Sequence, residues 1–180
     1  MPKKQNFNSL VMLATLAMLI ALEVVLSRLV APINTQFSKI SFGFVPIAIA
    51  AYLYGIKGGA VVAGVSDVIG AILFPSGEFF PGFTATAIFN GIIFGIFLGK
   101  KLEGKLNKFL RSFIPVVITQ VIGSFLINTF WISYMYHSSF TALLATRLVQ
   151  TLIMIAVEAV VIPIFTESFS KIKSIKMMRS

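Results

Sequence analysis

The order of apolar and polar positions divides the chain into six long apolar stretches separated by short polar or Pro/Gly-rich breaks. A helix that crosses a bilayer needs about 20 mostly apolar residues, and fewer when it is buried among other helices. The pattern therefore predicts an all-α integral membrane protein, with one six-helix transmembrane domain over residues 1–180. The predicted spans cover residues 9–30, 40–54, 60–74, 83–98, 113–136 and 140–165.

Helix breakers mark most of the boundaries between these stretches. Pro32 follows the first stretch, and a proline both lacks the N–H that continues a helix and disfavours helix in the residue before it. The second stretch is expected to be short or kinked at Pro46 and to end at the glycine-rich segment 55–59. A Pro/Gly-rich turn over residues 75–82 and the strongly polar segment 99–111 bound the fourth stretch.

Composition supports a membrane protein and excludes a soluble domain. The chain is 57% hydrophobic and only 12% charged, with a mean hydropathy of +0.94, whereas soluble proteins carry about 25% charged residues. The net charge of +9 comes from short basic clusters between the apolar stretches, which is typical of membrane topology signals and not of a nucleic-acid partner. With no cysteine and one histidine, we expect no metal site.

Six crossings would place both termini on the same side of the membrane. Twelve of the fifteen Lys and Arg residues then fall on that side, and an excess of positive residues marks the cytoplasmic side. We therefore expect a multi-pass protein of the cell membrane with cytoplasmic termini. The exceptions, Arg28, Lys39 and Arg147, fall near the outer ends of predicted spans. They could form an outward-facing pocket for an anionic solute, or each could lie among lipid headgroups.

One carboxylate, Asp67, stands in the third stretch among small and apolar residues. Because an ionised group inside a membrane is costly, it usually serves a binding site or pairs with another polar group. The residues that share its helix face are small, and such a face either lets another backbone approach or leaves room for a ligand. Glu78 follows in the Pro/Gly-rich turn and is the weaker candidate of these two acidic residues.

Other polar residues lie inside the predicted spans. On the sixth span, Arg147 and Glu158 share a helix face, but a rise of 1.5 Å per residue separates them by roughly 16 Å. Each therefore needs a partner on another helix, a ligand or water, and so does Glu23 in the first span. A polar stripe on the fifth span is also explained by hydrogen bonds between membrane helices. That stripe consists of Gln120, Ser124, Asn128 and Trp131.

Two motifs that would indicate an enzyme fail on their spacing or position. The segment 95–101 has three residues between its glycines where a phosphate-binding loop has four, and Lys101 stands where that loop needs Ser or Thr. Ser66 and His137 would need to lie within hydrogen-bond reach to act as nucleophile and base, yet the histidine falls in a short loop between spans five and six. We therefore expect no enzymatic activity and no nucleotide binding by this chain.

Four segments resemble a known family of transport proteins, and the resemblance extends over nearly the whole chain. The segments are residues 22–28, 39–46, 67–70 and 74–84, of which those from Lys39 to Thr84 are the most specific. They are similar to the folate-specific substrate-binding subunit, or S component, of an energy-coupling factor (ECF) transporter. The resemblance implies an S-component fold with six short spans and both termini inside.

The resemblance also implies a mechanism and a set of partners. S components bind a vitamin from outside, beneath the loop between spans one and two, and dock on a coupling membrane protein that is attached to two ATPases. They then topple in the membrane and release the vitamin inside, so that ATP is used only by the partner subunits and no cofactor is expected here. The family's docking signature on span one, A-x-x-x-A, is matched by Ala17 and Ala21.

Folate as the implied ligand suggests roles for the candidate site residues. A buried carboxylate can accept a pair of hydrogen bonds from the amino-pyrimidinone edge of a pterin, and such charge-assisted bonds are strong. Asp67 is our candidate for that role. The carboxylates of the glutamate tail need a cation, and the ring systems need aromatic partners. The candidates for the tail are Arg28, Lys39 and Arg147, and those for the rings are Phe42, Phe83 and Trp131.

Two other functions stay open on the sequence alone. The first is an S component for another vitamin such as thiamine, although a cationic ligand would leave the three outer basic residues without a purpose. The second is a self-sufficient proton-coupled carrier that uses Asp67 and Glu158 as proton relays. Uptake by this subunit alone, driven by a pH gradient, would support the carrier.

Overall fold

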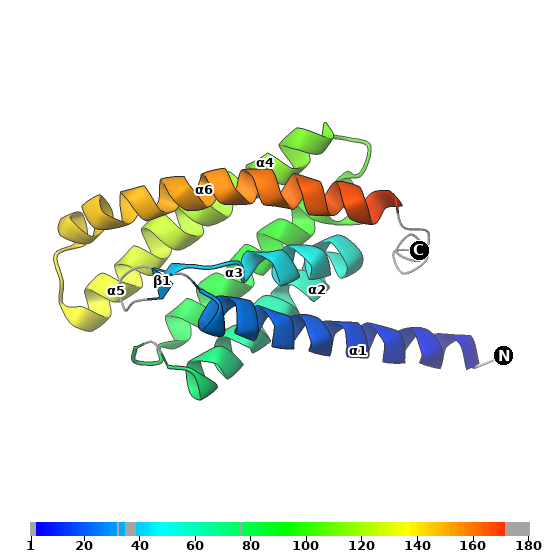
Figure 1. Ribbon diagram of the computed structural model, residues 1–180, viewed down its shortest axis with the longest axis horizontal. Helices are drawn as coiled ribbons and strands as arrows, with labels where there is room; N and C mark the ends of the chain where they lie inside the picture. Colours follow the sequence, from blue (N-terminus) through cyan, green and yellow to red (C-terminus); the bar gives the residue numbers. More distant parts are fainter. Residues whose placement is uncertain (1–2, 32, 35–38, 76, 172–180) are drawn as a thin grey trace.

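The computed structural model describes the backbone of residues 3–31, 33–34, 39–75 and 77–171, and within these ranges the side chains of residues 9–31, 40–75, 77–100 and 102–169. Long helices lie side by side, with α6 and α4 along one edge of the bundle, α1 along the other, and α2 and α3 between them (Figure 1). The helices are α1 (Lys3–Val24), α2 (Phe44–Leu73), α3 (Pro81–Leu98), α4 (Lys108–Ile118), α5 (Asn128–Tyr136) and α6 (Phe140–Lys171). Shorter elements are the π-helical η1 (Val25–Leu29) and η3 (Thr119–Ile127), the 3-10 turn η2 (Lys100–Leu102), and the strands β1 (Ile33–Asn34) and β2 (Lys39–Ile40).

Helix α2 folds back on itself at Gly55. That residue has φ 64° and ψ −147°, outside the helical region, and a glycine adopts a positive φ at little cost. A Cβ atom on Gly58 would lie 2.6 Å from the carbonyl oxygen of Ala50, although eight residues of continuous helix would separate the two by about 12 Å. The residues 44–54 and 56–73 are therefore two arms packed against each other, which we call the first and second arms of α2.

The predicted membrane character is confirmed, and the two arms of α2 match the second and third predicted stretches. Five helices in the described part of the chain are long and apolar enough to cross a membrane, with α2 counted once. Its first arm is only about 16 Å long, about half of a bilayer's hydrocarbon core. Six separate crossings therefore remain a prediction, as does the side on which the termini lie. Figure 1 shows the start of α1 and the end of α6 at the same end of the bundle.

The second predicted span begins later than expected. We predicted helix from residue 40, but Lys39 and Ile40 form β2, which pairs antiparallel with β1 in the register Ile33↔Ile40. The helix begins at Phe44, so Pro46 lies in its first turn. An N–H in the first turn has no partner within the helix, so the proline's missing N–H is tolerated there. The second span is thus short and is not kinked at Pro46.

The fifth predicted span is a composite of three elements. Helix begins at Lys108 instead of residue 113, and α4 continues without a break through η3 into α5. Arg111, in the polar segment of the sequence, hydrogen-bonds to carbonyl groups at the C-terminal end of α3. Its Nε donates to the Phe97 carbonyl at 2.7 Å, and its Nη2 donates to the carbonyls of Leu98 and Gly99. The long π-helical stretch η3 was not expected, and π-turns are often found at functional sites.

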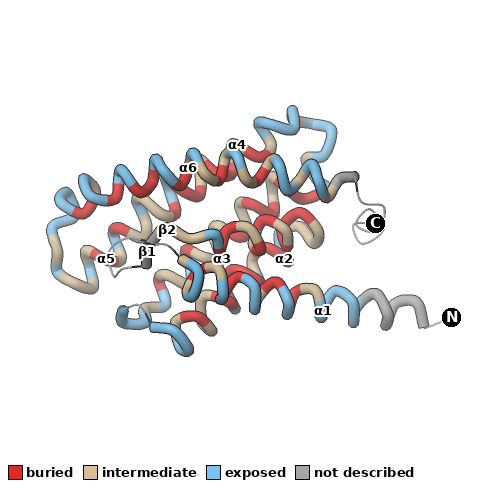
Figure 2. Tube along the Cα trace, in the orientation of Figure 1, coloured by how far each residue is buried: buried red, intermediate tan, exposed pale blue. Residues whose placement is uncertain are grey.

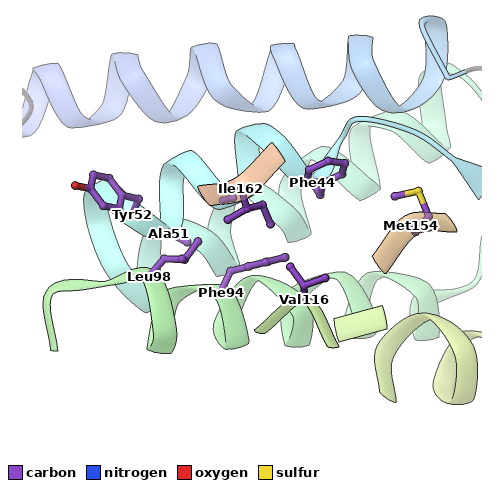
Figure 3. Close-up of a cluster of buried hydrophobic side chains, with 9 residues drawn as sticks. Phe44, Ala51, Tyr52, Phe94, Leu98, Val116, Met154 and Ile162 are labelled. Atoms are coloured by element: carbon purple, nitrogen blue, oxygen red, sulfur yellow. The ribbon is translucent and has the colours of Figure 1, made fainter. Parts of the chain in front are cut away.

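A compact apolar core joins α2, α3, α4 and α6 (Figure 3). Close approach of α2 and α3 depends on glycine, because a methyl group on Gly91 would overlap the carbonyl of Gly59. The outward faces of the helices are largely exposed (Figure 2), and they carry large apolar side chains such as Leu13 and Ile72, as expected for helices that face lipid. The core consists of Phe44, Ala48, Ala51, Tyr52, Phe94, Leu98, Val116, Met154 and Ile162.

Candidate functional site

Asp67 lies in a cluster with Arg28 and Thr84, which three different elements supply. The Nη2 atom of Arg28, at the end of η1, lies 3.6 Å from Asp67 Oδ1, and the two side chains are 11% and 21% exposed. Thr84, in the first turns of α3, donates a hydrogen bond from Oγ1 to Asp67 Oδ2 at 2.8 Å. Asp67 therefore has the partners that we predicted it would need, a cation and a hydroxyl. The same carboxylate compensates the positive charge of Arg28.

Small residues around Asp67 make room for the arginine. Gly70 lies one turn beyond Asp67 on the second arm of α2, and a Cβ atom there would lie 2.8 Å from Arg28 Nε. One turn earlier, a Cβ on Gly64 would lie 2.7 Å from a side-chain carbon of Ile88 on α3. The space that these two glycines leave is therefore filled by the side chains of Arg28 and Ile88.

An aromatic cluster surrounds Phe80, the residue before α3. Its ring centroid lies 5.3 Å from that of Trp131 and 6.2 Å from those of Phe83 and Tyr134. The Trp131 Nε1–H donates to Thr86 Oγ1 at 3.2 Å, and that hydroxyl donates to the carbonyl of Gly82 at 2.9 Å. Two predicted ring-binding residues, Phe83 and Trp131, thus come together through Phe80, which the sequence reasoning did not single out.

The first turns of α3 connect the two groups. Thr84 contacts Asp67 on α2, and Thr86, two residues later, contacts Trp131 on α5. Because residues i and i+2 point to different sides of a helix, the Asp67 cluster and the aromatic cluster lie on different sides of α3. Phe42, the third predicted aromatic residue, is 39% exposed and packs on Phe44, with ring centroids 6.3 Å apart.

A seam of buried polar side chains runs between α6 and the η3–α5 segment. Arg147 is only 5% exposed and donates from Nη2 to the Ser124 carbonyl at 3.0 Å and to its hydroxyl at 3.5 Å. Deeper in the bundle, Gln120 Nε2 donates to Glu158 Oε1 at 2.6 Å, and Glu158 is 2% exposed. The polar stripes predicted on spans five and six therefore face each other.

Several buried polar atoms of this seam, together with Asn90 Oδ1, which faces Gly123 of η3 from α3, make no hydrogen bond within the described part of the chain. Interior polar groups are nearly always paired, so these atoms need partners that the described residues do not supply, such as water or a ligand. Asn90 and Thr129 belong to this group, and sequence reasoning missed both; a polar side chain within a long apolar stretch was the signal. The atoms are Asn90 Oδ1, Gln120 Oε1, Asn128 Oδ1, Thr129 Oγ1, Arg147 Nε, Thr151 Oγ1 and Glu158 Oε2.

The remaining predicted residues fall in three places. Lys39 lies in β2, where its backbone pairs with Asn34, and its side chain lies outside the described residues. Ala17 and Ala21 are exposed on α1, one turn apart. Glu23 lies beside the start of α2, since a Cβ atom on Gly43 would lie 2.6 Å from its Oε1. A carboxylate in that position is favoured by the partial positive charge of a helix N-terminus.

A cavity of about 280 Å³ lies at the other end of the bundle, where α3 and α6 end and α4 begins. Its lining includes Tyr52, Leu98, Lys108, Phe109 and Pro163. None of the predicted ligand-binding residues borders it. The described titratable side chains also contain no group of three or more His, Cys, Asp or Glu that could hold a metal ion.

Comparison with known proteins gives consistent matches over most of the chain. Residues 11–165 match the family described as "ECF transporter, substrate-specific component". The folate transporter FolT of Clostridium novyi (strain NT) is 35% identical over 148 residues, which are 82% of this chain and 83% of that protein. The folate transporter FolT of Leuconostoc mesenteroides subsp. mesenteroides is 34% identical over 148 residues, or 79% of this chain and 77% of that protein.

A solved structure shares the fold. The crystal structure of FolT bound with folic acid superposes with a TM-score of 0.73 at 32% sequence identity, covering 82% of this chain and 86% of that chain. The likeness therefore covers most of the chain, in agreement with the resemblance seen along the sequence.

Proposed function

The chain belongs to the family of substrate-specific components of ECF transporters. We propose that the substrate for which it is specific is folate. The observation that carries the proposal is the near full-length match, in both sequence and fold, to a FolT structure that holds folic acid. The curated relatives are folate transporters as well, which favours folate over thiamine. The protein is a membrane-embedded transporter component and not a member of an enzyme family.

The family membership suggests how the chain works with partners. We propose that it binds folate from the extracellular side, with both termini in the cytoplasm, and docks on an ECF coupling protein that carries two ATPase subunits. Toppling of the docked component would then release the vitamin inside the cell. The exposed residues Ala17 and Ala21 support docking through α1, because small residues let another helix come close.

The geometry around Asp67 supports a role in binding the pterin. Thr84 donates a hydrogen bond to Asp67 Oδ2 at 2.8 Å. Arg28 Nη2 lies 3.6 Å from Asp67 Oδ1, beyond the 2.7–3.2 Å of an ordinary hydrogen bond. Oδ1 therefore retains capacity to accept a hydrogen bond from the amino-pyrimidinone edge. Phe83 and Trp131, on the other side of the first turns of α3, are the proposed ring contacts.

The proposed function predicts folate binding by the purified subunit. Folate added to the protein in detergent or nanodiscs is expected to quench the fluorescence of its single tryptophan, Trp131, because that indole lies in the proposed site. Calorimetry is expected to show saturable binding of folate and none of thiamine. Uptake into liposomes is expected only with the ECF module and ATP. A folded subunit that gives neither quenching nor heat with folate would overturn the proposal, and pH-driven uptake by the subunit alone would support the proton-coupled carrier.

Asp67→Asn is expected to lower the affinity for folate by about tenfold or more, because a hydrogen bond to a charged group contributes about 1.5–3 kcal/mol. The substitution keeps the shape of the side chain, removes its charge and leaves Arg28 without its carboxylate. Folate titration by calorimetry measures the change.

Glu78→Gln is the matched control, because Glu78 is an exposed acid in the turn between α2 and α3 and its substitution removes the same charge. Its affinity for folate should equal that of the unsubstituted protein. Full affinity in Asp67→Asn would show that Asp67 does not hold the pterin.

A further inference from the structure

Arg147 carries a buried charge that none of the described acidic side chains neutralises. The side chain is only 5% exposed. Its Nη2 donates to the carbonyl and hydroxyl oxygens of Ser124, while Nε makes no hydrogen bond within the described part of the chain. All six acidic residues of the sequence have described side chains, and none of them pairs with Arg147. A carbonyl oxygen satisfies a donor but does not compensate the charge.

Such an arrangement is expensive inside a membrane protein. A buried ion that lacks a counter-ion is strongly destabilising, and intramembrane charged residues usually mark sites of function. An arginine at the end of a span can place its guanidinium among lipid headgroups. Here the guanidinium instead contacts Ser124, which belongs to the π-helical segment η3. It therefore points into the bundle, where a ligand and not a lipid headgroup would meet it.

Arg28, the other candidate arginine, differs from Arg147 in this respect. Arg28 already faces Asp67 at 3.6 Å, so its charge is compensated before any ligand binds. Glu158, which shares the helix face of Arg147, is held by Gln120 at 2.6 Å and lies about 16 Å along the axis from Arg147. Of the two candidate arginines, Arg147 is thus the one whose charge remains to be balanced.

We propose that Arg147 binds a carboxylate of the transported ligand, with Nε as a donor, and that the ligand's acidic end lies in the seam between α6 and η3. The proposal rests on the proposed function, since folate carries its carboxylates on the glutamate tail. A guanidinium is suited to this role because its fork of N–H donors matches the two oxygens of a carboxylate. The Ser124 hydroxyl, 3.5 Å from Nη2, is close enough to contribute a further hydrogen bond to the same anion.

The test compares folate with its diamide, in which both tail carboxylates are converted to amides, on the full-length purified protein. The unsubstituted protein is expected to bind folate at least tenfold more tightly than the diamide. Arg147→Gln is expected to weaken folate binding by about 10- to 100-fold, as for the loss of one charge-assisted hydrogen bond, and to leave diamide binding within about threefold. Lys57→Gln removes a positive charge from an exposed position near the Gly55 turn and should change neither affinity.

Each other outcome contradicts the proposal in a recognisable way. Equal weakening of folate and diamide by Arg147→Gln would show that Arg147 does not meet a carboxylate. A protein that binds both ligands equally, but whose affinity changes when chloride is replaced by gluconate, would show that Arg147 holds a small anion from solution. Failure to bind either ligand would instead contradict the proposed function itself.

A second variant keeps the test valid if Arg147→Gln does not fold. Arg147→Lys retains the charge but lacks the fork of donors, so its preference for folate over the diamide should fall while its diamide affinity is kept. In parallel, ¹⁵N-labelled arginine in the unsubstituted protein should show a dipolar coupling to ¹³C-labelled tail carboxylates of bound folate, and Arg147→Lys should remove it. Persistence of the coupling in that variant would assign the carboxylate to a different arginine.

Discussion

Ala17→Trp is expected to leave folate binding intact and to abolish folate uptake by the assembled transporter. Ala17 and Ala21 are exposed on α1, and their neighbours Leu13 and Met18 are each 66% exposed, so a tryptophan can be accommodated in the isolated subunit. Docking of another membrane helix against this stripe needs small residues that let the two backbones approach. A tryptophan would hold the coupling protein away and prevent ATP hydrolysis from driving release.

Binding and transport must be measured on the same preparations. Calorimetric titration gives the folate affinity of the subunit, and ATP-dependent uptake in liposomes with the ECF module gives transport. Leu126→Trp is the control, because Leu126 is likewise exposed, at 44%, but lies on η3 and not on α1. It should reduce neither quantity. Normal uptake by Ala17→Trp would remove this stripe of α1 from the docking surface.

Glu158→Leu is expected to lower the free energy of unfolding by about 2 kcal/mol, whereas Glu158→Gln should lower it by much less. The carboxylate accepts a hydrogen bond from Gln120 at 2.6 Å in the interior of the bundle. Leucine removes the acceptor and leaves the Gln120 amide buried without a partner, but glutamine keeps a carbonyl oxygen at the same position. Thermal unfolding of the purified variants in detergent measures the difference.

The double variant Gln120→Leu/Glu158→Leu provides the decisive comparison. Replacing both members of a buried polar pair by apolar groups of similar shape can be nearly neutral, since no group is left unpaired. The double variant should therefore be more stable than Glu158→Leu alone. Losses that simply add would show that the two side chains do not act as a pair.

The sequence was sufficient to predict most of the helices. In a bilayer each backbone polar group must be paired within its own segment, so the length of an apolar run and the breakers at its ends determine where a helix lies. The reversal at Gly55 was predicted in this way, and so was the turn before α3. The antiparallel pairing of β1 with β2 and the π-helical η3 were not, because both depend on hydrogen-bond partners that composition does not identify.

For the candidate site, the sequence identified residues but not their partners. Asp67, Arg147, Glu23 and Glu158 stood out because a charge in an apolar stretch is costly. Asn90 and Thr129 were missed because a single uncharged polar residue in an apolar stretch carries little signal, although Thr129 lies in the polar seam and Asn90 faces Gly123 of η3 from α3. Phe80 was missed because an aromatic residue in an aromatic-rich chain carries no signal before its neighbours are known.

By itself, then, the sequence determined that this is a helical membrane protein and which of its charged residues need an explanation. Only the tertiary structure decided that Asp67 is balanced by Arg28, that Glu158 accepts a hydrogen bond from Gln120, and that Arg147 pairs with none of the described acidic side chains. The physical reason is that these two effects act over different separations along the chain. Burial in lipid acts on each segment separately and is visible along the chain, whereas the pairing of charges depends on how distant helices rotate and pack against one another.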